Sequence, residues 1–323
     1  MLRMLPFTGS ASDWDDLVVR LENGNVFASH AWSTVQAMKG WRTLRFVGGE
    51  QARAFQLFTK KFGQFGTLGW VPGGIIGSSA QLDASLRESI QNSIQTPLSY
   101  LRIAFPFPLS YDVIADATWQ RATKYLGAAQ SVVLDLSRSL ETLKSEMGPN
   151  WRRNLKRSER TPVIVRRLSI EDLPAISQLE KTTTALKGIN VRSSQASGDI
   201  LGSLGDCAVV VGVFSTSSEM VSLRGASILG TSARDLVSAT SMTGRRTYAS
   251  YAATWELIRI LKSLGIRHFD LAGIDPVSNP GVADFKCGLG GNVIDYAGEY
   301  VSSRPQSLKF LANLVLYRQL SSA

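Results

Sequence analysis

The side chains best placed for chemistry lie near the end of the chain. Phe285 and Lys286 follow a loop rich in glycine, proline, asparagine and serine, Gly273 to Gly281, and precede a glycine cluster at 288–291. Because glycine lets a ligand approach the backbone, this arrangement can hold the Lys286 ammonium near a bound phosphate or a developing oxyanion. The alternative is a surface lysine in a hairpin whose glycines only serve turns.

A second group of candidates lies in residues 151–160, where five of ten residues are basic. On a helix, spacings of three, four and seven residues bring side chains to one face. Such a face can neutralise several phosphates, which predicts contact with a nucleic acid or a diphosphate. A merely solvated basic helix is the alternative. The basic residues are Arg152, Arg153, Lys156, Arg157 and Arg160, of which the last four share a face.

Three further polar side chains are candidates for substrate binding. Arg224 interrupts an apolar run that we predict to be a strand, and a buried charge needs a ligand or a partner. We therefore expect either a phosphate contact or an internal ion pair with an acidic residue. Tyr248 and Tyr251 stand at the start of a predicted helix, where they can stack on a base, hydrogen-bond a reacting amine or pack at the rim of the core.

Two stretches resemble the FemABX family, which builds peptidoglycan cross-bridges by transferring amino acids from aminoacyl-tRNA. The first reads FDLAGIDP, then FK, then GLGG, and continues into Tyr296 to Glu299. The second, residues 132–160, has a strand ending in Asp135-Leu136, a helix and the arginine-rich run. Their order and spacing extend the resemblance over most of the chain from Phe27 onward.

The resemblance implies an α+β fold made of two acetyltransferase-like (GNAT-like) subdomains, with mixed, largely antiparallel sheets covered by helices. The first would comprise residues 1–130 with 300–323, and the second residues 131–299, including Phe285 and Lys286. A length of 323 residues, of which 44% are hydrophobic, also favours two domains.

The resemblance further implies acyl transfer from aminoacyl-tRNA to an amine acceptor, without a cofactor or a covalent enzyme intermediate. An aminoacyl ester is already activated, so positioning and oxyanion stabilisation by Lys286 and backbone N–H groups suffice. Phe285 and Lys286 would receive the acceptor end of the tRNA, and the basic helix would follow its backbone. Asp270 would orient the substrate amine or hold the end of a strand.

The N-terminal part departs from the family pattern, in which a phosphate-binding lysine follows an aromatic residue by one turn. Here Gln36 stands one turn after Trp32, and the nearest lysine is Lys39. This departure puts contact with a nucleotide diphosphate in doubt. Trp32 and Lys39 remain candidates for acceptor binding, with a simple exposed cation as the alternative for Lys39.

Two other functions fit parts of the sequence. An acyl-CoA-dependent N-acyltransferase of cell-envelope or polysaccharide synthesis would use the same kind of fold. The Arg/Gln-x-x-Gly-x-Gly/Ala motif that presents backbone to CoA pyrophosphate has no match here. A protein that binds nucleic acid or sugar nucleotides without catalysis would depend chiefly on the basic helix.

Charge and composition restrict the partners. Thirty-five Lys and Arg residues against 26 Asp and Glu residues give a formal charge of +9, which favours an anionic partner. Two cysteines and two histidines predict neither a disulfide framework nor a metal site. Without a signal peptide or an apolar run of membrane-spanning length, we expect a cytoplasmic protein, with peripheral membrane contact left open.

Hydrophobic periodicity predicts the elements that position these residues. Ser12 is expected to cap the first helix. The helices are predicted over 12–22, 27–40, 82–94, 151–160, 170–187, 249–264 and 307–320, and the strands over 41–47, 52–60, 67–71, 100–105, 132–135, 208–214, 221–229, 236–241 and 266–271.

Overall fold

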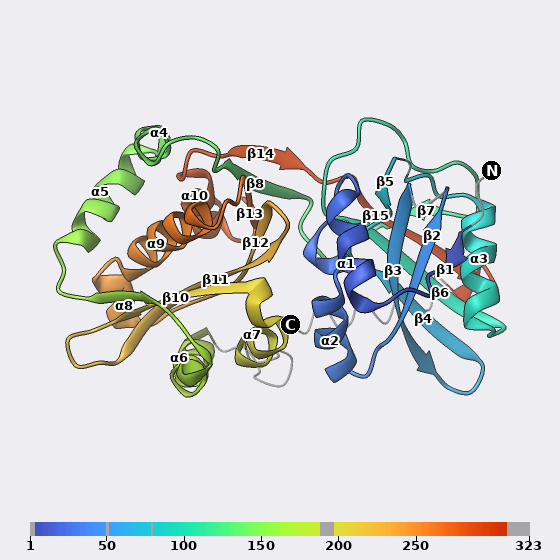
Figure 1. The fold of residues 1–323 in the computed structure, drawn as a ribbon, viewed down its shortest axis with the longest axis horizontal. Coiled ribbons are helices and arrows are strands. Elements are labelled where there is room, and N and C mark those ends of the chain that lie inside the picture. The colour runs from blue at the N-terminus through green and yellow to red at the C-terminus, as the bar shows by residue number, and fades with distance from the viewer. Residues whose placement is uncertain (1–3, 50–51, 79, 188–196, 309–323) are drawn as a thin grey trace. The chain divides into compact units, whose positions relative to one another are not determined.

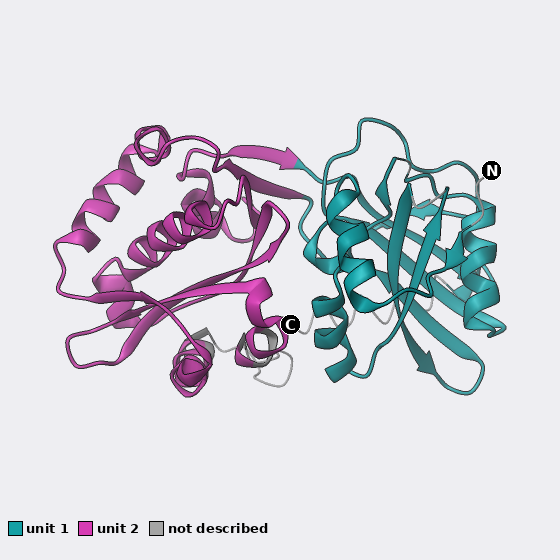
Figure 2. Cartoon of the chain, in the orientation of Figure 1, with its two compact units in different colours: residues 1–129, 295–323 teal, residues 130–294 magenta. Residues whose placement is uncertain are grey.

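The chain divides into two compact units in the computed structural model, which describes residues 4–49, 52–78, 80–187 and 197–308 (Figures 1 and 2). Unit 1 consists of Met1–Ala129 and the chain from Asp295, and unit 2 of Gln130–Ile294. Most of the helix predicted over 307–320, and of the predicted domain segment 300–323, lies outside the described residues.

Unit 1 is built on a sheet whose strands are ordered β1-β2-β3-β4-β6-β15-β7, with β5 paired to β3. β4 and β6 run parallel, whereas β2–β3, β3–β4 and β6–β15 are antiparallel. The late strand β15 lies between β6 and β7. The strands are β1 Leu5–Pro6, β2 Arg42–Gly48, β3 Arg53–Phe62, β4 Gly66–Val71, β5 Ile76–Gly77, β6 Leu98–Phe105, β7 Gln120–Arg121 and β15 Gly298–Arg304.

The helices of unit 1 include α1 (Ala11–Arg20), α2 (His30–Met38) and α3 (Ala84–Ile94). Ser10, and not Ser12, caps α1, because Ser10 forms a capping box with Asp13: the Asp13 N–H donates to Ser10 Oγ at 3.1 Å and the Ser10 N–H to Asp13 Oδ2 at 2.9 Å. The prediction therefore placed the start of the helix one to two residues late.

A buried ion pair joins two strands of unit 1. Arg102 on β6 pairs with Glu299 on β15, and both side chains are almost fully buried. The remaining atoms also have partners: Arg102 donates to the Lys124 carbonyl and to the Tyr100 hydroxyl, and Glu299 Oε1 accepts two backbone N–H groups at 126–127, both at 2.8 Å. This pair is satisfied on all sides.

Unit 2 has a sheet ordered β14-β8-β13-β12-β11-β10-β9. β12 and β13 run parallel, and the pairs β8–β13, β11–β12, β10–β11 and β9–β10 are antiparallel. The strands are β8 Gln130–Asp135, β9 Ile164–Arg167, β10 Ala208–Phe214, β11 Met220–Leu229, β12 Ser232–Thr240, β13 His268–Ile274 and β14 Asn292–Asp295.

Helices cover both faces of this sheet. Val209 and Val211 of β10 belong to the core that includes α9, whereas Val210 between them lines a hollow beside α6 and α7, as the alternation of a strand requires. α5 packs on α9. The helices are α4 Leu140–Glu146, α5 Pro149–Glu159, α6 Leu173–Lys187, α7 Ser197–Leu204, α8 Met242–Arg246, α9 Ala249–Ser263 and α10 Pro280–Cys287.

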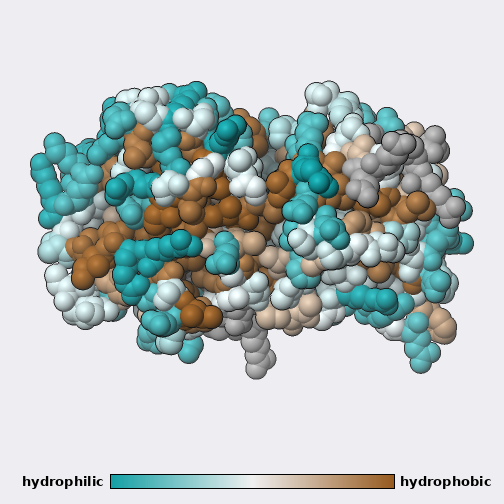
Figure 3. Space-filling view, in the orientation of Figure 1, coloured by the Kyte–Doolittle hydropathy of each residue, from teal (hydrophilic) through white to brown (hydrophobic). Residues whose placement is uncertain are grey.

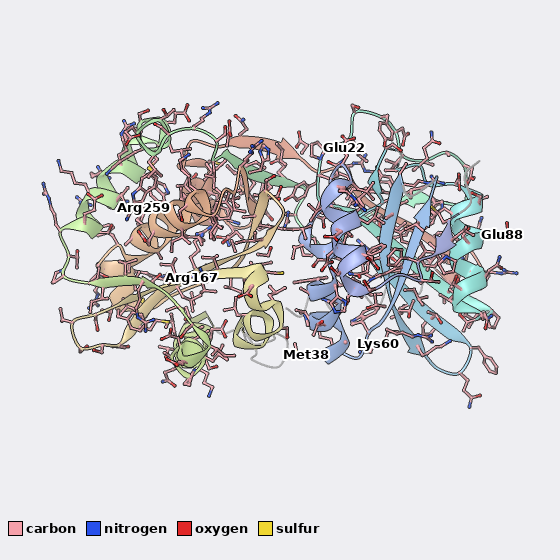
Figure 4. All side chains as sticks on the ribbon, viewed as in Figure 1. Glu22, Met38, Lys60, Glu88, Arg167 and Arg259 are labelled. Carbon is pink, nitrogen blue, oxygen red and sulfur yellow. The ribbon has the colours of Figure 1, made fainter. Side chains whose placement is uncertain are left out.

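Two mixed, mostly antiparallel sheets with helical covers confirm the predicted α+β class. Helix α9 carries the ion pair Glu256–Arg259, in which the Arg259 side chain is the more exposed; Arg259 is labelled in Figure 4. Within the described parts of the chain, a helix with the length and apolarity needed to cross a bilayer is not found.

Candidate functional site

Unit 2 contains a polar pocket of about 530 Å³ formed by α6, β11, β12, α8, α9 and α10. Its charged lining residues are Arg224, Asp235, Arg245 and Lys286. Hydroxyl and amide side chains complete the polar part of the wall, so the pocket suits a ligand with several hydrogen-bonding groups. These uncharged polar residues are Thr183, Ser238, Thr240, Ser250 and Asn279.

Lys286 lies on helix α10, so the alternative of a surface lysine in a hairpin is wrong. Pro280 at the first turn starts this helix, and Lys286 is in its last turn. The side chain is only 8% exposed, and Nζ donates to the carbonyls of Ala272 at 3.2 Å and Gly273 at 2.8 Å. Two of the three ammonium N–H groups are thereby used, and one is left for a ligand.

Burial lowers the pKa of Lys286 from its ordinary value, as its largest cause, and the nearby charge of Arg224 lowers it further. The carboxylates of Asp235 and Asp270 act in the opposite direction. Lys286 therefore loses its proton at a lower pH than a surface lysine does.

The two carbonyls that hold Lys286 come from an irregularity in β13. The pairing of β13 with β8 shifts register between Asp270 and Gly273, and Ala272 has a left-handed backbone with φ of 60°. A bulge of this kind re-aims backbone groups away from the regular ladder. Gly273, predicted as a ligand contact, therefore acts through its carbonyl on the Lys286 ammonium.

Asp270 stabilises this bulge. Its Oδ1 accepts the Ala272 N–H at 2.8 Å and the Ser131 hydroxyl, and its Oδ2 pairs with Arg234. Asp270 is not among the residues that line the pocket. Of the two roles predicted for it, its contacts favour holding the strand, which makes it a positioning residue for Lys286.

Arg224 forms the internal ion pair that was one of its two predicted interpretations. Its Nη2 lies 2.8 Å from Oδ2 of Asp235, and the two side chains are 7% and 9% exposed. Arg224 Nε and Asp235 Oδ1 are buried without a hydrogen-bond partner among the described residues. Burial raises the pKa of Asp235, although the charges of Arg224 and Lys286 oppose this rise.

Asp235 is not among the predicted site residues, because the predicted strand begins at residue 236 and leaves Asp235 in a turn. β12 in fact starts at Ser232 and pairs with β11 across a bulge between Gly225 and Ala226. Arg224 could have indicated Asp235. A cation in a buried strand needs a carboxylate partner, and the neighbouring strand is the nearest element that can supply one.

Phe285 is fixed by an aromatic cluster behind the pocket. Its ring lies 5.4 Å from that of Trp151 and 5.1 Å from that of Tyr251, and the Trp151 indole N–H donates to the Phe285 carbonyl at 2.9 Å. The Arg224 guanidinium lies 5.3 Å from the centre of the Phe285 ring. Phe285 thus links the ion pair to α5 and α9.

Tyr248 and Tyr251, which were predicted to bind substrate, pack against α5 and are not among the residues that line the pocket. Tyr251 accepts a hydrogen bond from Asn154 Nδ2 at 3.0 Å. Tyr248, left-handed at φ 57°, accepts one from Arg157 at 2.9 Å and lies under its guanidinium. Their contacts favour the structural interpretation over base stacking.

The basic residues of α5 are exposed, and hydrophilic residues dominate the region of α5 in Figure 3. The Arg152 side chain points toward α4, where it donates to the carbonyls of Ser145 and Met147, both at 2.7 Å. Arg153, Lys156 and the helix-capping Arg160 remain on the surface with Arg157.

Trp32 and Lys39 belong to unit 1. Trp32 on α2 is 8% exposed and meets the Phe27 ring edge-on at 5.0 Å. Lys39 follows the last turn of α2 with an exposed side chain, and its carbonyl accepts from Lys60 Nζ at 3.1 Å. Trp32 packs in the core of unit 1, where its Nε1 is buried without a hydrogen-bond partner among the described residues. Lys39 is exposed, although partial burial lowers its pKa, and acceptor binding by these two residues stays a prediction.

A second hollow of about 500 Å³ in unit 2 is lined mainly by aliphatic residues of β9, β10, α6 and α7. Its lining residues do not include a buried ion pair like Arg224–Asp235 of the first pocket. Across the described residues, groups of three or more His, Cys, Asp and Glu side chains able to hold a metal ion are not found.

The comparisons with known proteins concern the fold. No protein-family model and no curated protein matches the sequence. The crystal structure of FemX is similar with a TM-score of 0.79 at 14% identity, over 95% of this chain and 99% of that chain. The C-terminal domain of a putative lysylphosphatidylglycerol synthetase from Agrobacterium fabrum gives 0.61 at 13% identity, over 95% and 96%.

A tandem GNAT protein from the clavulanic acid biosynthesis pathway is also similar, with a TM-score of 0.55 at 12% identity, over 94% of this chain and 99% of that chain. Both units therefore take part in the likeness. The chain has the fold of FemX, a tandem GNAT-like α+β architecture, as the resemblance to the FemABX family predicted.

Proposed function

We propose that this chain is an acyltransferase that moves an aminoacyl group from aminoacyl-tRNA to an amine acceptor such as that of a peptidoglycan precursor or a small peptide. One observation carries the proposal: a buried lysine ammonium in the wall of a polar pocket, with one N–H left for a ligand. The FemX fold supports it.

Aminoacyl transfer requires the protein only to align two substrates and to stabilise one oxyanion. The acceptor nitrogen attacks the ester carbonyl of the donor, a C–N bond forms, and the carbonyl oxygen becomes an oxyanion. Lys286 stabilises this oxyanion through its free N–H, and collapse breaks the C–O bond to the tRNA ribose. Because the ester is already activated, alignment of the two substrates supplies much of the remaining acceleration.

The exposed basic residues of α5 support tRNA as the donor, because a row of cations is suited to a phosphate backbone. With charged tRNA as the donor, the reaction would take place in the cytoplasm. Acyl-CoA is the second candidate donor, and the likeness to a tandem GNAT protein favours it. The donor experiment below separates the two.

We would incubate the full chain with mixed radiolabelled aminoacyl-tRNA or with acyl-CoA, together with candidate amines, and follow label in amide products. Loss of product after ribonuclease treatment identifies tRNA as the donor. Lys286→Met is expected to lower the rate about 100-fold or more, because an oxyanion donor is removed. Lys286→Arg, which keeps the charge but not the shape, is expected to lie in between.

Lys262→Met is the matched control. Lys262 also donates to two backbone carbonyls, those of Leu136 and Arg138 at 2.8 and 2.5 Å, but it does not line the pocket. We expect this variant to keep the wild-type rate. Equal losses in both lysine variants, or consumption of neither donor by the wild-type protein, would contradict the proposed function.

The role of α5 is tested by replacing Arg153, Lys156 and Arg160 with alanine. If tRNA is the donor, its KM rises and the slope of log KM against log salt falls by about 0.7–0.9 for each lost phosphate contact. The value of kcat stays near wild type. Arg259→Ala on α9, which removes another exposed arginine, is the control. An unchanged salt slope would argue against tRNA contact by α5.

A further inference from the structure

The open ion pair in the pocket is unusual for a buried pair. Buried polar atoms in proteins nearly always have a hydrogen-bond partner, and leaving one without a partner is costly. Asp235 Oδ1 and Arg224 Nε lack partners among the described residues, and both side chains line the same pocket. The acceptor Oδ1, which lacks a donor, points to a ligand that supplies one.

The charges around Asp235 come from several elements. Arg224 on β11, Lys286 on α10 and Arg245 on α8 line the pocket with it, and Asp270 on β13 and Arg234 on β12 contribute from behind. Among the described residues that line the pocket, Asp235 is the only carboxylate. A cationic or N–H-bearing part of a ligand would therefore be drawn to Oδ1.

An ammonium group fits this position best. It donates a charge-assisted hydrogen bond, which a carboxylate oxygen accepts more strongly than a bond from a neutral hydroxyl. A phosphate or carboxylate would be repelled by Oδ1 and would select the cations instead. The pocket thus offers separate places for a cationic nitrogen at Asp235 and for a developing anion at Lys286.

We propose, building on the acyl transfer proposed above, that Asp235 is the catalytic residue that binds the ammonium form of the acceptor amine through Oδ1 and takes up its proton. Burial keeps this carboxyl group a better proton acceptor than an exposed aspartate, which agrees with such a role. The acceptor class is then a primary amine that is cationic at neutral pH.

One ammonium proton passes to Asp235 Oδ1 and from there to solvent, which frees the nitrogen lone pair. The nitrogen forms the new C–N bond and the carbonyl oxygen takes the electron pair as an oxyanion beside Lys286. When the C–O ester bond breaks, a second proton from the nitrogen ends on the leaving ribose oxygen, giving an amide and a hydroxyl.

Asp235→Asn tests the proposal with two acceptor amines and the donor that the wild-type protein consumes. Ethylamine is protonated at neutral pH, whereas methoxyamine is already neutral and needs no base. We expect Asp235→Asn to lower transfer to ethylamine about 100-fold, with a much smaller loss for methoxyamine. With ethylamine, the wild-type rate should level off at the pKa of Asp235, and the variant rate only at the pKa of the amine.

Asp172→Asn is the control, because it weakens another Arg–Asp pair of unit 2, Arg166–Asp172, away from the pocket. Thermal unfolding of both variants shows whether the fold is kept. A double variant, Arg224→Gln with Asp235→Asn, replaces the whole pair by neutral amides and should show the same selective loss for ethylamine.

A binding measurement makes the test independent of turnover. In protein labelled with ¹³C at aspartate carboxyl groups, added ethylammonium should lower the pKa of Asp235, and ethanol should not. A shift without acyl transfer keeps the ammonium site and rejects the proposed function. Transfer with equal losses for both amines, or an Asp235 resonance that ethylammonium leaves unchanged, overturns the inference.

Discussion

The two buried arginine–carboxylate pairs of this chain differ in how completely they are satisfied. In unit 1, Arg102 and Glu299 use backbone groups and a tyrosine hydroxyl to satisfy their remaining atoms. In unit 2, Arg224 and Asp235 share one hydrogen bond and leave Nε and Oδ1 without partners in the described structure. Both pairs join neighbouring strands, β6 and β15 in the first and β11 and β12 in the second, and the second pair borders a pocket.

A structural ion pair and an ion pair in a binding site can be told apart by their unused hydrogen-bonding atoms. Burial is nearly the same for both pairs, so burial alone does not distinguish them. The two pairs differ in the number of side-chain atoms that lack a hydrogen-bond partner. A buried atom without a partner is costly, and it can persist in a binding site because the ligand forms the missing hydrogen bond. The pair of unit 1 should therefore act on stability and the pair of unit 2 on activity.

The largest effect is expected from Glu299→Gln. Removing the negative charge leaves Arg102 uncompensated in the core, which should lower the free energy of unfolding by about 3–5 kcal/mol. Urea denaturation followed by circular dichroism measures this. Asp235→Asn is the matched change in unit 2, where Arg224 likewise loses its charged partner. We expect a smaller loss there, because Arg224 borders a pocket that solvent can fill and Asp235 Oδ1 has no hydrogen bond to lose. A loss of equal size in both would break the comparison.

The next effect concerns the backbone that holds the pocket. Ala272→Val places a β-branched residue at φ 60°, which should cost about 1–3 kcal/mol and displace the carbonyls that hold Lys286. Unfolding free energy and transfer rate should both fall. Ala272→Gly tolerates this backbone and serves as the control. If the valine variant kept full activity, the bulge would not position Lys286.

A smaller effect is expected when both charges of a pair are removed together. Arg224→Gln with Asp235→Asn should change the free energy of unfolding by no more than about 1 kcal/mol, because two desolvated charges are replaced by neutral groups. The same double change at Arg102 and Glu299 should cost more, since the Lys124 carbonyl and the 126–127 N–H groups lose charged partners. Chemical denaturation of the two double variants tests this ranking.

The smallest effect is a shift in pH dependence. The pKa of Lys286 lies below its ordinary value of 10.5, and the ammonium is the form that stabilises an oxyanion. Activity should therefore fall as the pH rises through this lowered pKa, and the fall should begin below pH 10.5. Rates measured over the pH range in which the ester donor survives test this. In Lys286→Arg the fall should move to higher pH, because guanidinium keeps its proton.

Local patterns predicted much of the fold. β10 was predicted over 208–214, where the structure places it, because a short valine-rich run between polar turns has few alternatives. α9 differs from its prediction by one residue at its end. The short helix α10 was missed because glycine and proline suggested a loop, although proline is common at the first position of a helix.

Only some residues of the candidate site could be predicted from the sequence. Lys286 and Phe285 stood out by their neighbours in sequence, and both line the pocket. Asp235 and the bulge at Ala272 did not, because strand register and a left-handed alanine depend on contacts between distant segments. The ion pair of unit 1 joins residues 197 positions apart and was likewise beyond local patterns.

The position of β15 has a consequence for how the protein is made. This strand separates β6 from β7, so the sheet of unit 1 has a gap until residues 298–304 leave the ribosome. Unit 2 is continuous in sequence and can form earlier. We therefore expect unit 2 to be able to fold before unit 1 is complete, because unit 1 still lacks β15 and the glutamate that neutralises Arg102.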